Sequence, residues 1–169
     1  MCLPVHPYKI EREWEHAGLK CAVVQAREAQ NRCGYVRVPP GHPLHGKHYD
    51  AVDVSVHGGL TFADVEPCEH EDGAGWWFGF DCAHLGDAFY DPNPNWNELS
   101  NDAQHFLTTM ESIHRDVSHK FGFSRPPEHF WTQAEVETET ERLAEQLAII
   151  DMKQDIDNVV KRLKSKVKR

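Results

Sequence analysis

The last 38 residues, from Thr132 to Arg169, restrict the fold most, because their apolar side chains keep a helical period throughout. Thr132 with Glu135 three residues later is a capping-box pattern, which predicts where the helix begins. Two apolar stripes follow, the second near-heptad and shifted in phase. The first is Leu143, Leu147 and Ile150, and the second is Met152, Ile156, Val159, Leu163 and Val167. The sequence therefore predicts a long C-terminal helix, residues 132–169, after an α+β domain at 1–131.

At about 1.5 Å of rise per residue, this helix is longer than a compact domain of 169 residues needs. The surplus length and the near-heptad stripe favour a coiled-coil contact with a second chain, and hence a homo-oligomer. A disordered basic tail after Ile150 is the alternative. The basic end, KRLKSKVKR, suits a helix C-terminus, where positive charge complements the helix dipole.

Charge is divided unevenly along the chain. The formal net charge is −9, but the last nine residues hold six of the 18 basic side chains and no acidic ones. An acidic body disfavours nucleic acid as a partner, because affinity for phosphate backbones depends on clustered Lys and Arg. Only the basic tail is suited to nucleic acid.

Two further helices are expected. Residues 8–31 are charged, almost free of glycine and contain scattered apolar positions, which favours a helix. Residues 103–121 carry apolar side chains at separations of three or four from Leu107 onward, which is typical of an amphipathic helix.

The sheet is predicted from three segments. Residues 35–38 form a short strand that the following prolines interrupt. The stretch AVDVSVHGGLTFADVE has the clearest strand pattern in the chain. Val52, Val54 and Val56 alternate with polar residues, and Leu60 and Phe62 resume the apolar pattern after the glycine turn. The aromatic stretch GWWFGF is the third strand. Together they predict an α+β fold with a small antiparallel sheet core, flanked by helices.

No apolar run is long enough to cross a membrane, and the N-terminal residues lack the apolar region of a secretory signal. A cytoplasmic protein without a membrane partner is therefore expected. The five cysteines have no disulfide-framework spacing, which indicates free thiols or metal ligands.

Polar residues suited to a binding site follow the strands. They are His57, Gly58 and Gly59 in one turn, and Asp81, His84 and Asp87 in DCAHLGD. A glycine turn exposes backbone N–H groups that can approach a phosphate closely. Lys47 and Arg37 are cations that could meet phosphate, and Trp77 offers a flat face on which a base could stack. This set suits a small nucleotide-like ligand.

Two other kinds of site stay open. Cys68, His70, Cys82 and His84 are a legitimate tetrahedral zinc set, although each Cys–His pair is separated by one residue only. Cys82 with a neighbouring His and Asp has the parts of a nucleophilic arrangement, although a cysteine in FGFDCA is more often a buried small hydrophobic residue. No P-loop, dinucleotide-binding, zincin or serine-hydrolase motif is present.

The strings YVRVPPGHPLHGKHYD, VDVSVHGGLTFA and WWFGFDCAHLGD resemble a family of small, uncharacterised proteins of actinobacterial phages. The segment WTQAEVETETERLAEQLA is similar to the usual ending of that family. The resemblance implies a phage accessory protein that acts in the host cytoplasm. By analogy with other such proteins, it implies sequestration of a nucleotide-derived immune signal, which needs affinity but no cofactor and no turnover.

Two alternatives to sequestration remain at this stage. One is a metal- or histidine-dependent hydrolase of a nucleotide or phosphate ester that uses the same residues. The other is an inhibitor of a host protein that binds through the C-terminal helix, with the HGGLTF and DCAH segments as scaffold.

Overall fold

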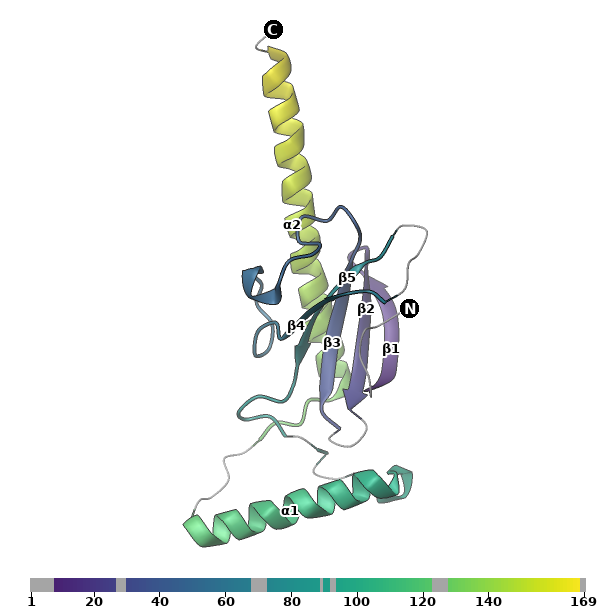
Figure 1. Cartoon of the computed structure of the whole chain (residues 1–169), viewed down its shortest axis with the longest axis vertical. Helices are drawn as coiled ribbons and strands as arrows, with labels where there is room; N and C mark the ends of the chain where they lie inside the picture. Colours follow the sequence, from purple (N-terminus) through teal and green to yellow (C-terminus); the bar gives the residue numbers. More distant parts are fainter. Residues whose placement is uncertain are drawn as a thin grey trace.

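The computed structural model describes residues 8–26, 30–67, 73–88, 90–91, 94–122 and 128–167. Within these ranges the protein has an α+β fold, with one five-stranded antiparallel sheet in the order β1-β2-β3-β5-β4 (Figure 1). The strands are β1 (Tyr8–His16), β2 (Leu19–Ala26), β3 (Arg32–Val38), β4 (Phe62–Val65) and β5 (Trp76–Asp81). The helices are α1 (Asn101–Phe121), α2 (Gln133–Val167) and the short 3-10 turns Tyr49–Ala51 and Trp96–Glu98. The predicted fold class is confirmed.

The helix expected over residues 8–31 is wrong, because residues 8–26 form the hairpin of β1 and β2. The reversal occurs at Ala17 and Gly18, which have φ values of 50° and 78°. Two adjacent positive φ angles match the twist of a two-residue hairpin turn, and glycine supplies one of them without steric cost. β2 is buried on both of its faces, so its apolar residues follow neither a simple helical nor a simple strand period.

The strand expected in AVDVSVHGGLTFADVE forms only in its last part, as β4. The segment 52–56 is extended but forms no strand of the sheet, which corrects the strand expected there. Its three valines do pack against the core, and the alternate residues Asp53 and Ser55 are exposed. The backbone of Ser55 pairs with the side chain of Gln146 on α2, whose Oε1 accepts at 2.7 Å and whose Nε2 donates at 2.9 Å. A helix side chain therefore replaces a neighbouring strand as the partner of this segment.

The two other predicted strands are confirmed as β3 and β5, which pair from Cys33 with Asp81 to Val38 with Trp76. Phe78 and Phe80 point into the core beneath α2, whereas Trp77 belongs to the cluster on the opposite face of the sheet. The aromatic stretch is thus a central strand with both faces buried.

The first half of α2 covers one face of the sheet, where Val136, Leu143 and Leu147 are fully buried. The helix begins with the predicted capping box, because Glu135 Oε2 accepts from Thr132 N at 2.8 Å. Beyond about Ile149 the helix leaves the sheet and projects from the body (Figure 1). The long C-terminal helix is confirmed, and its first half is an integral part of the core.

The predicted amphipathic helix is confirmed as α1, which begins after the N-cap Ser100 and ends at Gly122 in the left-handed region. It lies apart from the sheet (Figure 1), and within it only Ala103 and Leu107 are buried. Among the described residues, no helix is both long and apolar enough to cross a membrane.

Candidate functional site

Three polar side chains from two turns meet at one end of the sheet. His57 lies in the turn after the extended segment, and His84 and Asp87 lie in the turn after β5. One ligand-type atom of each residue lies within 4.8 Å of the others. We call His57, His84 and Asp87 the His–His–Asp cluster. Their proximity agrees with the sequence analysis, whereas their role in binding is still a prediction.

Asp87 is the centre of this cluster and is only 4% exposed. Its Oδ2 accepts hydrogen bonds from His57 Nε2 and from the backbone N–H of His84, both at 2.8 Å. Its Oδ1 accepts from the indole N–H of Trp131 at 2.9 Å. Burial alone would raise the pKa of Asp87, but these three hydrogen bonds outweigh burial and lower it. The carboxylate is therefore held in its charged form.

His57 is fixed from three sides. Its backbone N–H donates to Glu139 Oε1 on α2 at 2.8 Å, and its ring packs against Trp131 with centroids 4.3 Å apart. Because Nε2 points to Asp87, the ring orientation is determined. No residue that the structure describes hydrogen-bonds to its Nδ1.

His84 contains an unsatisfied nitrogen. Its Nδ1 is buried and has no hydrogen-bond partner within the described ranges. Two carboxylate oxygens lie just beyond hydrogen-bond reach, Asp87 Oδ2 at 3.7 Å and Asp81 Oδ1 at 3.8 Å. Leaving a buried polar atom unpaired costs about 1–3 kcal/mol, so such an atom in a native fold calls for an explanation.

Gly58 allows the backbone of its turn to pack directly against the ring of His84. A Cβ built on Gly58 would lie 2.1–2.4 Å from three atoms of the His84 ring. The residue also has a φ of 65°, which side chains rarely adopt. Gly59, with a φ of 84°, closes the same turn through its N–H to the carbonyl of Val56. The HGG sequence thus brings the backbone against the imidazole, and no separate phosphate-binding role is needed to explain it.

Three predicted site residues lie elsewhere. Trp77 is fully buried on the far face of the sheet and cannot stack on a ligand. Arg37 is 4% exposed and pairs with the buried Glu66 at 2.7 Å, so it is not free to meet a phosphate. Lys47 contacts Trp76, at the opposite end of β5 from Asp81. These placements correct the expected phosphate and base contacts.

The predicted cysteine chemistry is also limited. Cys68 and His70 lie outside the described residues. Cys82 is 1% exposed, and burial, reinforced by the charge of Asp87, raises the pKa of its thiol far above the usual value. A thiol that stays protonated is a poor nucleophile. Cys82 therefore acts as a small apolar core residue, as the more frequent role of such a cysteine suggested.

Three residues at or beside the cluster were not predicted from the sequence: Trp131, Glu139 and Arg142. Trp131 and Glu139 contact the cluster from 44 and 82 residues away along the chain. Arg142 donates to Glu139 Oε2 at 2.8 Å, and its side chain is 61% exposed. Only Trp131 could have been identified from the sequence, because it is a tryptophan directly before the helix cap. Glu139 and Arg142 have the pattern of ordinary surface residues on an amphipathic helix.

The ligand-type atoms of the cluster lie close enough together that they could hold a metal ion. Zinc bonds of about 2.0–2.2 Å place two tetrahedral ligand atoms about 3.4 Å apart. Asp87 Oδ2 is 2.8 Å from His57 Nε2 and 3.7 Å from His84 Nδ1, so these separations lie on either side of that value. A cation would replace the proton shared by His57 and Asp87, and it would also satisfy the buried Nδ1 of His84.

No family model matches the chain, and no curated protein or solved structure is significantly similar to it. The resemblance to actinobacterial phage proteins therefore stays a prediction, and a functional proposal depends on the geometry of the His–His–Asp cluster.

Proposed function

We propose that the protein is a metal-dependent hydrolase of a small phosphate ester, with a divalent ion of the zinc type held by His57, His84 and Asp87. The observation that carries the proposal is the buried, unpaired Nδ1 of His84 beside two carboxylates. Imidazole and carboxylate are ordinary zinc ligands, and the lowered pKa of Asp87 keeps its carboxylate available to the ion.

The number of ligands favours catalysis over a structural role. Structural zinc sites have four protein ligands, whereas catalytic sites have three and keep an open position. The described cluster supplies three. The side chains of His57 and His84 are 24% and 31% exposed, so both imidazole rings are partly open to solvent although His84 Nδ1 itself is buried.

A phosphate ester is the proposed substrate class because the ion and Arg142 would both attract an anionic group. Arg142 is tied through Glu139 to the backbone of His57, and its guanidinium is largely exposed. This arginine takes the phosphate-binding role that sequence analysis assigned to Arg37 and Lys47. An arginine fork matches phosphate oxygens well.

The reaction adds one water across the ester. The water oxygen forms a bond to phosphorus, the bond from phosphorus to the leaving oxygen breaks, and the leaving oxygen takes a proton from solvent. The proton of the attacking water passes to Asp81, whose side chain is 32% exposed and whose Oδ1 lies 3.8 Å from His84 Nδ1. When bound, the metal supplies positive charge that polarises both water and phosphate.

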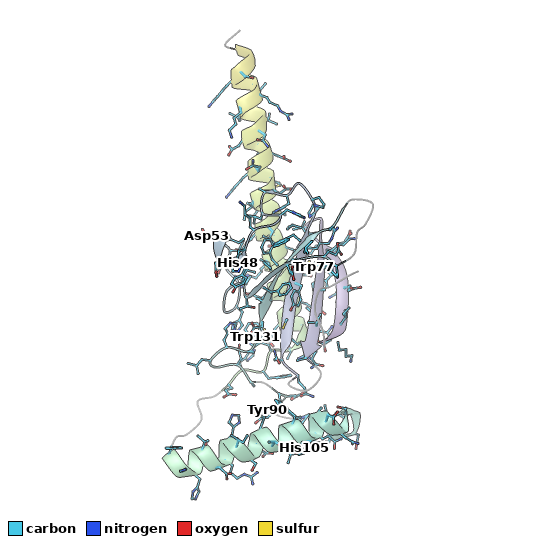
Figure 2. All side chains as sticks on the ribbon, in the orientation of Figure 1. His48, Asp53, Trp77, Tyr90, His105 and Trp131 are labelled. Carbon is cyan, nitrogen blue, oxygen red and sulfur yellow. The ribbon has the colours of Figure 1, made fainter. Side chains whose placement is uncertain are left out.

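Metal binding tests the site directly. Purified protein is dialysed against chelator and titrated calorimetrically with Zn²⁺ and, separately, Mn²⁺. We expect one ion per chain, proton release on binding, and an affinity at least about 100-fold lower in His84→Ala. His105→Ala, an exposed histidine on α1 (Figure 2), is the matched control and keeps full affinity. Equal affinity in His84→Ala and wild type contradicts the metal site.

Turnover is tested on the metal-loaded protein with p-nitrophenyl phosphate and bis(p-nitrophenyl) phosphate, and with a nucleotide extract analysed by mass spectrometry. We expect product formation that His84→Ala abolishes and that Arg142→Ala weakens mainly through a higher KM. Nucleotides that bind and return intact after heat denaturation contradict hydrolysis and favour sequestration instead.

The proposal keeps the phage setting as an expectation. A host immune signal of nucleotide type is itself a phosphate ester, so hydrolysis would remove by turnover what sequestration removes by binding. The host-cell cytoplasm is the compartment in which either action would have an effect.

A further inference from the structure

The projecting half of α2 carries an apolar stripe that no described residue covers. The members of the stripe are between 45% and 62% exposed, although all of them are large and apolar. They are Ile149, Met152, Ile156, Val159 and Leu163. A row of this kind on one helix is typical of a surface that binds another helix.

The spacing of the stripe is that of a coiled coil. Successive members are separated by three, four, three and four residues. In heptad notation Ile149, Ile156 and Leu163 occupy a positions, and Met152 and Val159 occupy d positions. Such a strict seam, about 21 Å long at 1.5 Å per residue, fits one partner helix of the same type.

We infer that the occupant of this stripe is the same stripe of a second copy of the chain, bound in the antiparallel direction. The orientation follows from charge. The first part of the projecting segment is acidic and the second part is basic. Asp151, Asp155 and Asp157 belong to the first, and Lys161, Arg162 and Lys164 belong to the second.

In a parallel pair the two basic ends would lie side by side. The sequence of residues 161–169 holds six basic and no acidic side chains, so a parallel pair sets twelve positive charges together. An antiparallel pair places each basic end beside the acidic part of the other chain. The antiparallel arrangement thus replaces repulsion at the end of the coil with attraction.

The register of the antiparallel pair follows from the same heptad. With the two-fold axis between Asp157 and Asn158, Ile156 packs on Val159 of the partner subunit. Met152 then packs on Leu163 of the partner subunit. In this register Asp155 and Arg162 both occupy g positions and face each other across the seam, twice per dimer. The apolar contacts and the charge pairs therefore both favour the same antiparallel register.

The first experiment is sedimentation equilibrium of the full-length protein. We expect a dimer for wild type and a monomer for Ile156→Asp. Gln154→Asp adds the same charge on the outer face of the same helix and is expected to remain a dimer. Because Ile156 is exposed in the single chain, its replacement leaves the body folded, which circular dichroism checks. A monomeric wild type at 100 μM overturns the inference.

Charge reversal tests the orientation. We expect Asp155→Arg and Arg162→Asp each to weaken the dimer by about tenfold, since two exposed pairs become like-charged. The double variant restores the opposite-charge pairs only in the antiparallel register and should recover wild-type dimerisation. A double variant weaker than both single variants contradicts the inferred alignment.

Cross-linking gives an independent test. In the antiparallel register, a mixture of the Met152→Cys and Leu163→Cys proteins forms a disulfide-linked heterodimer under mild oxidation, and neither variant links efficiently to itself. Wild type is the control for the native cysteines. Efficient self-linking of Met152→Cys indicates a parallel pair and overturns the inference.

Discussion

Asp87 joins three parts of the chain through a single carboxylate. Its hydrogen bonds reach the turn at His57, its own turn through His84, and the residue Trp131 just before α2. A parallel β-bridge between Asp87 and His129 fixes the same junction through the backbone. The residue therefore stabilises the local structure and, in the proposed function, ligates the ion.

Acid dependence provides a test at this position. Because the pKa of Asp87 is lowered in the folded protein, its contribution to stability is present above the unfolded value, about 3.9, and is lost as pH falls through the folded value. We expect Asp87→Asn to reduce the free energy of unfolding of the metal-free protein by about 1–3 kcal/mol at pH 7. The difference from wild type should shrink below about pH 4.

Urea denaturation at a series of pH values measures this effect. Asp50→Asn replaces an exposed carboxylate and should change stability by less than about 0.5 kcal/mol. A loss for Asp87→Asn that stays constant down to pH 2 contradicts the role of the charged carboxylate.

At the residue scale, the proximity of His57, His84 and Asp87 was predictable because each stands in a polar turn that follows an apolar segment. The turns HGG and DCAHLGD can be identified in the sequence because their polar residues follow apolar segments. The structure places His57, His84 and Asp87 of these turns together. Trp77 and Arg37 were assigned to the site by their chemistry alone, whereas burial gives them other partners. Trp131 and Glu139 were missed because only the docking of α2 brings them to the cluster.

The docking of α2 on β3 depends on one small residue. A Cβ on Gly34 would lie 2.2 Å from Thr140 Oγ1 and 2.5 Å from a ring carbon of Phe80. Both neighbours are buried, so the backbone of the strand and the helix approach each other only where no side chain intervenes.

A substitution at Gly34 tests this contact. We expect Gly34→Ala to lower the free energy of unfolding by about 1–3 kcal/mol, since the added methyl overpacks the core. Thr140→Ala in the same chain should recover part of the loss, because it removes one of the two clashing groups. Urea denaturation gives both values, and a Gly34→Ala variant as stable as wild type would show that the helix can shift without cost.

At the element scale, strands were predicted wrongly where the same pattern of apolar residues can arise from more than one kind of packing. The extended segment 52–56 alternates because its valines pack against the core and its backbone pairs with Gln146 of α2. Its alternating pattern therefore reflects burial and not strand pairing. β2 is buried on both faces, which removed the alternation that would have identified it. The helix α2, by contrast, was predictable from its two apolar stripes and its capping box.

For the whole molecule, the proposed site and the inferred dimer surface lie on different parts of α2. Glu139 and Arg142 belong to the half of the helix that covers the sheet, and Ile156 belongs to the projecting half. Because no described residue of the cluster contacts the projecting half, the two activities should be separable.

Zinc titration of Ile156→Asp measures this separation. We expect its affinity for Zn²⁺ to remain within about twofold of wild type, since a twofold change is only about 0.4 kcal/mol. A tenfold loss would show that dimerisation shapes the metal site.

Because α2 follows all five strands in the chain, its position determines when the sheet becomes covered during synthesis. The strands are synthesised before the helix that covers them, so a nascent chain on the ribosome exposes the sheet face with Phe78 and Phe80 until Leu147 has left the exit tunnel. Such an uncovered face is a target for chaperones. The His–His–Asp cluster gains Trp131 and Glu139 only then, so an immature chain cannot assemble the complete site.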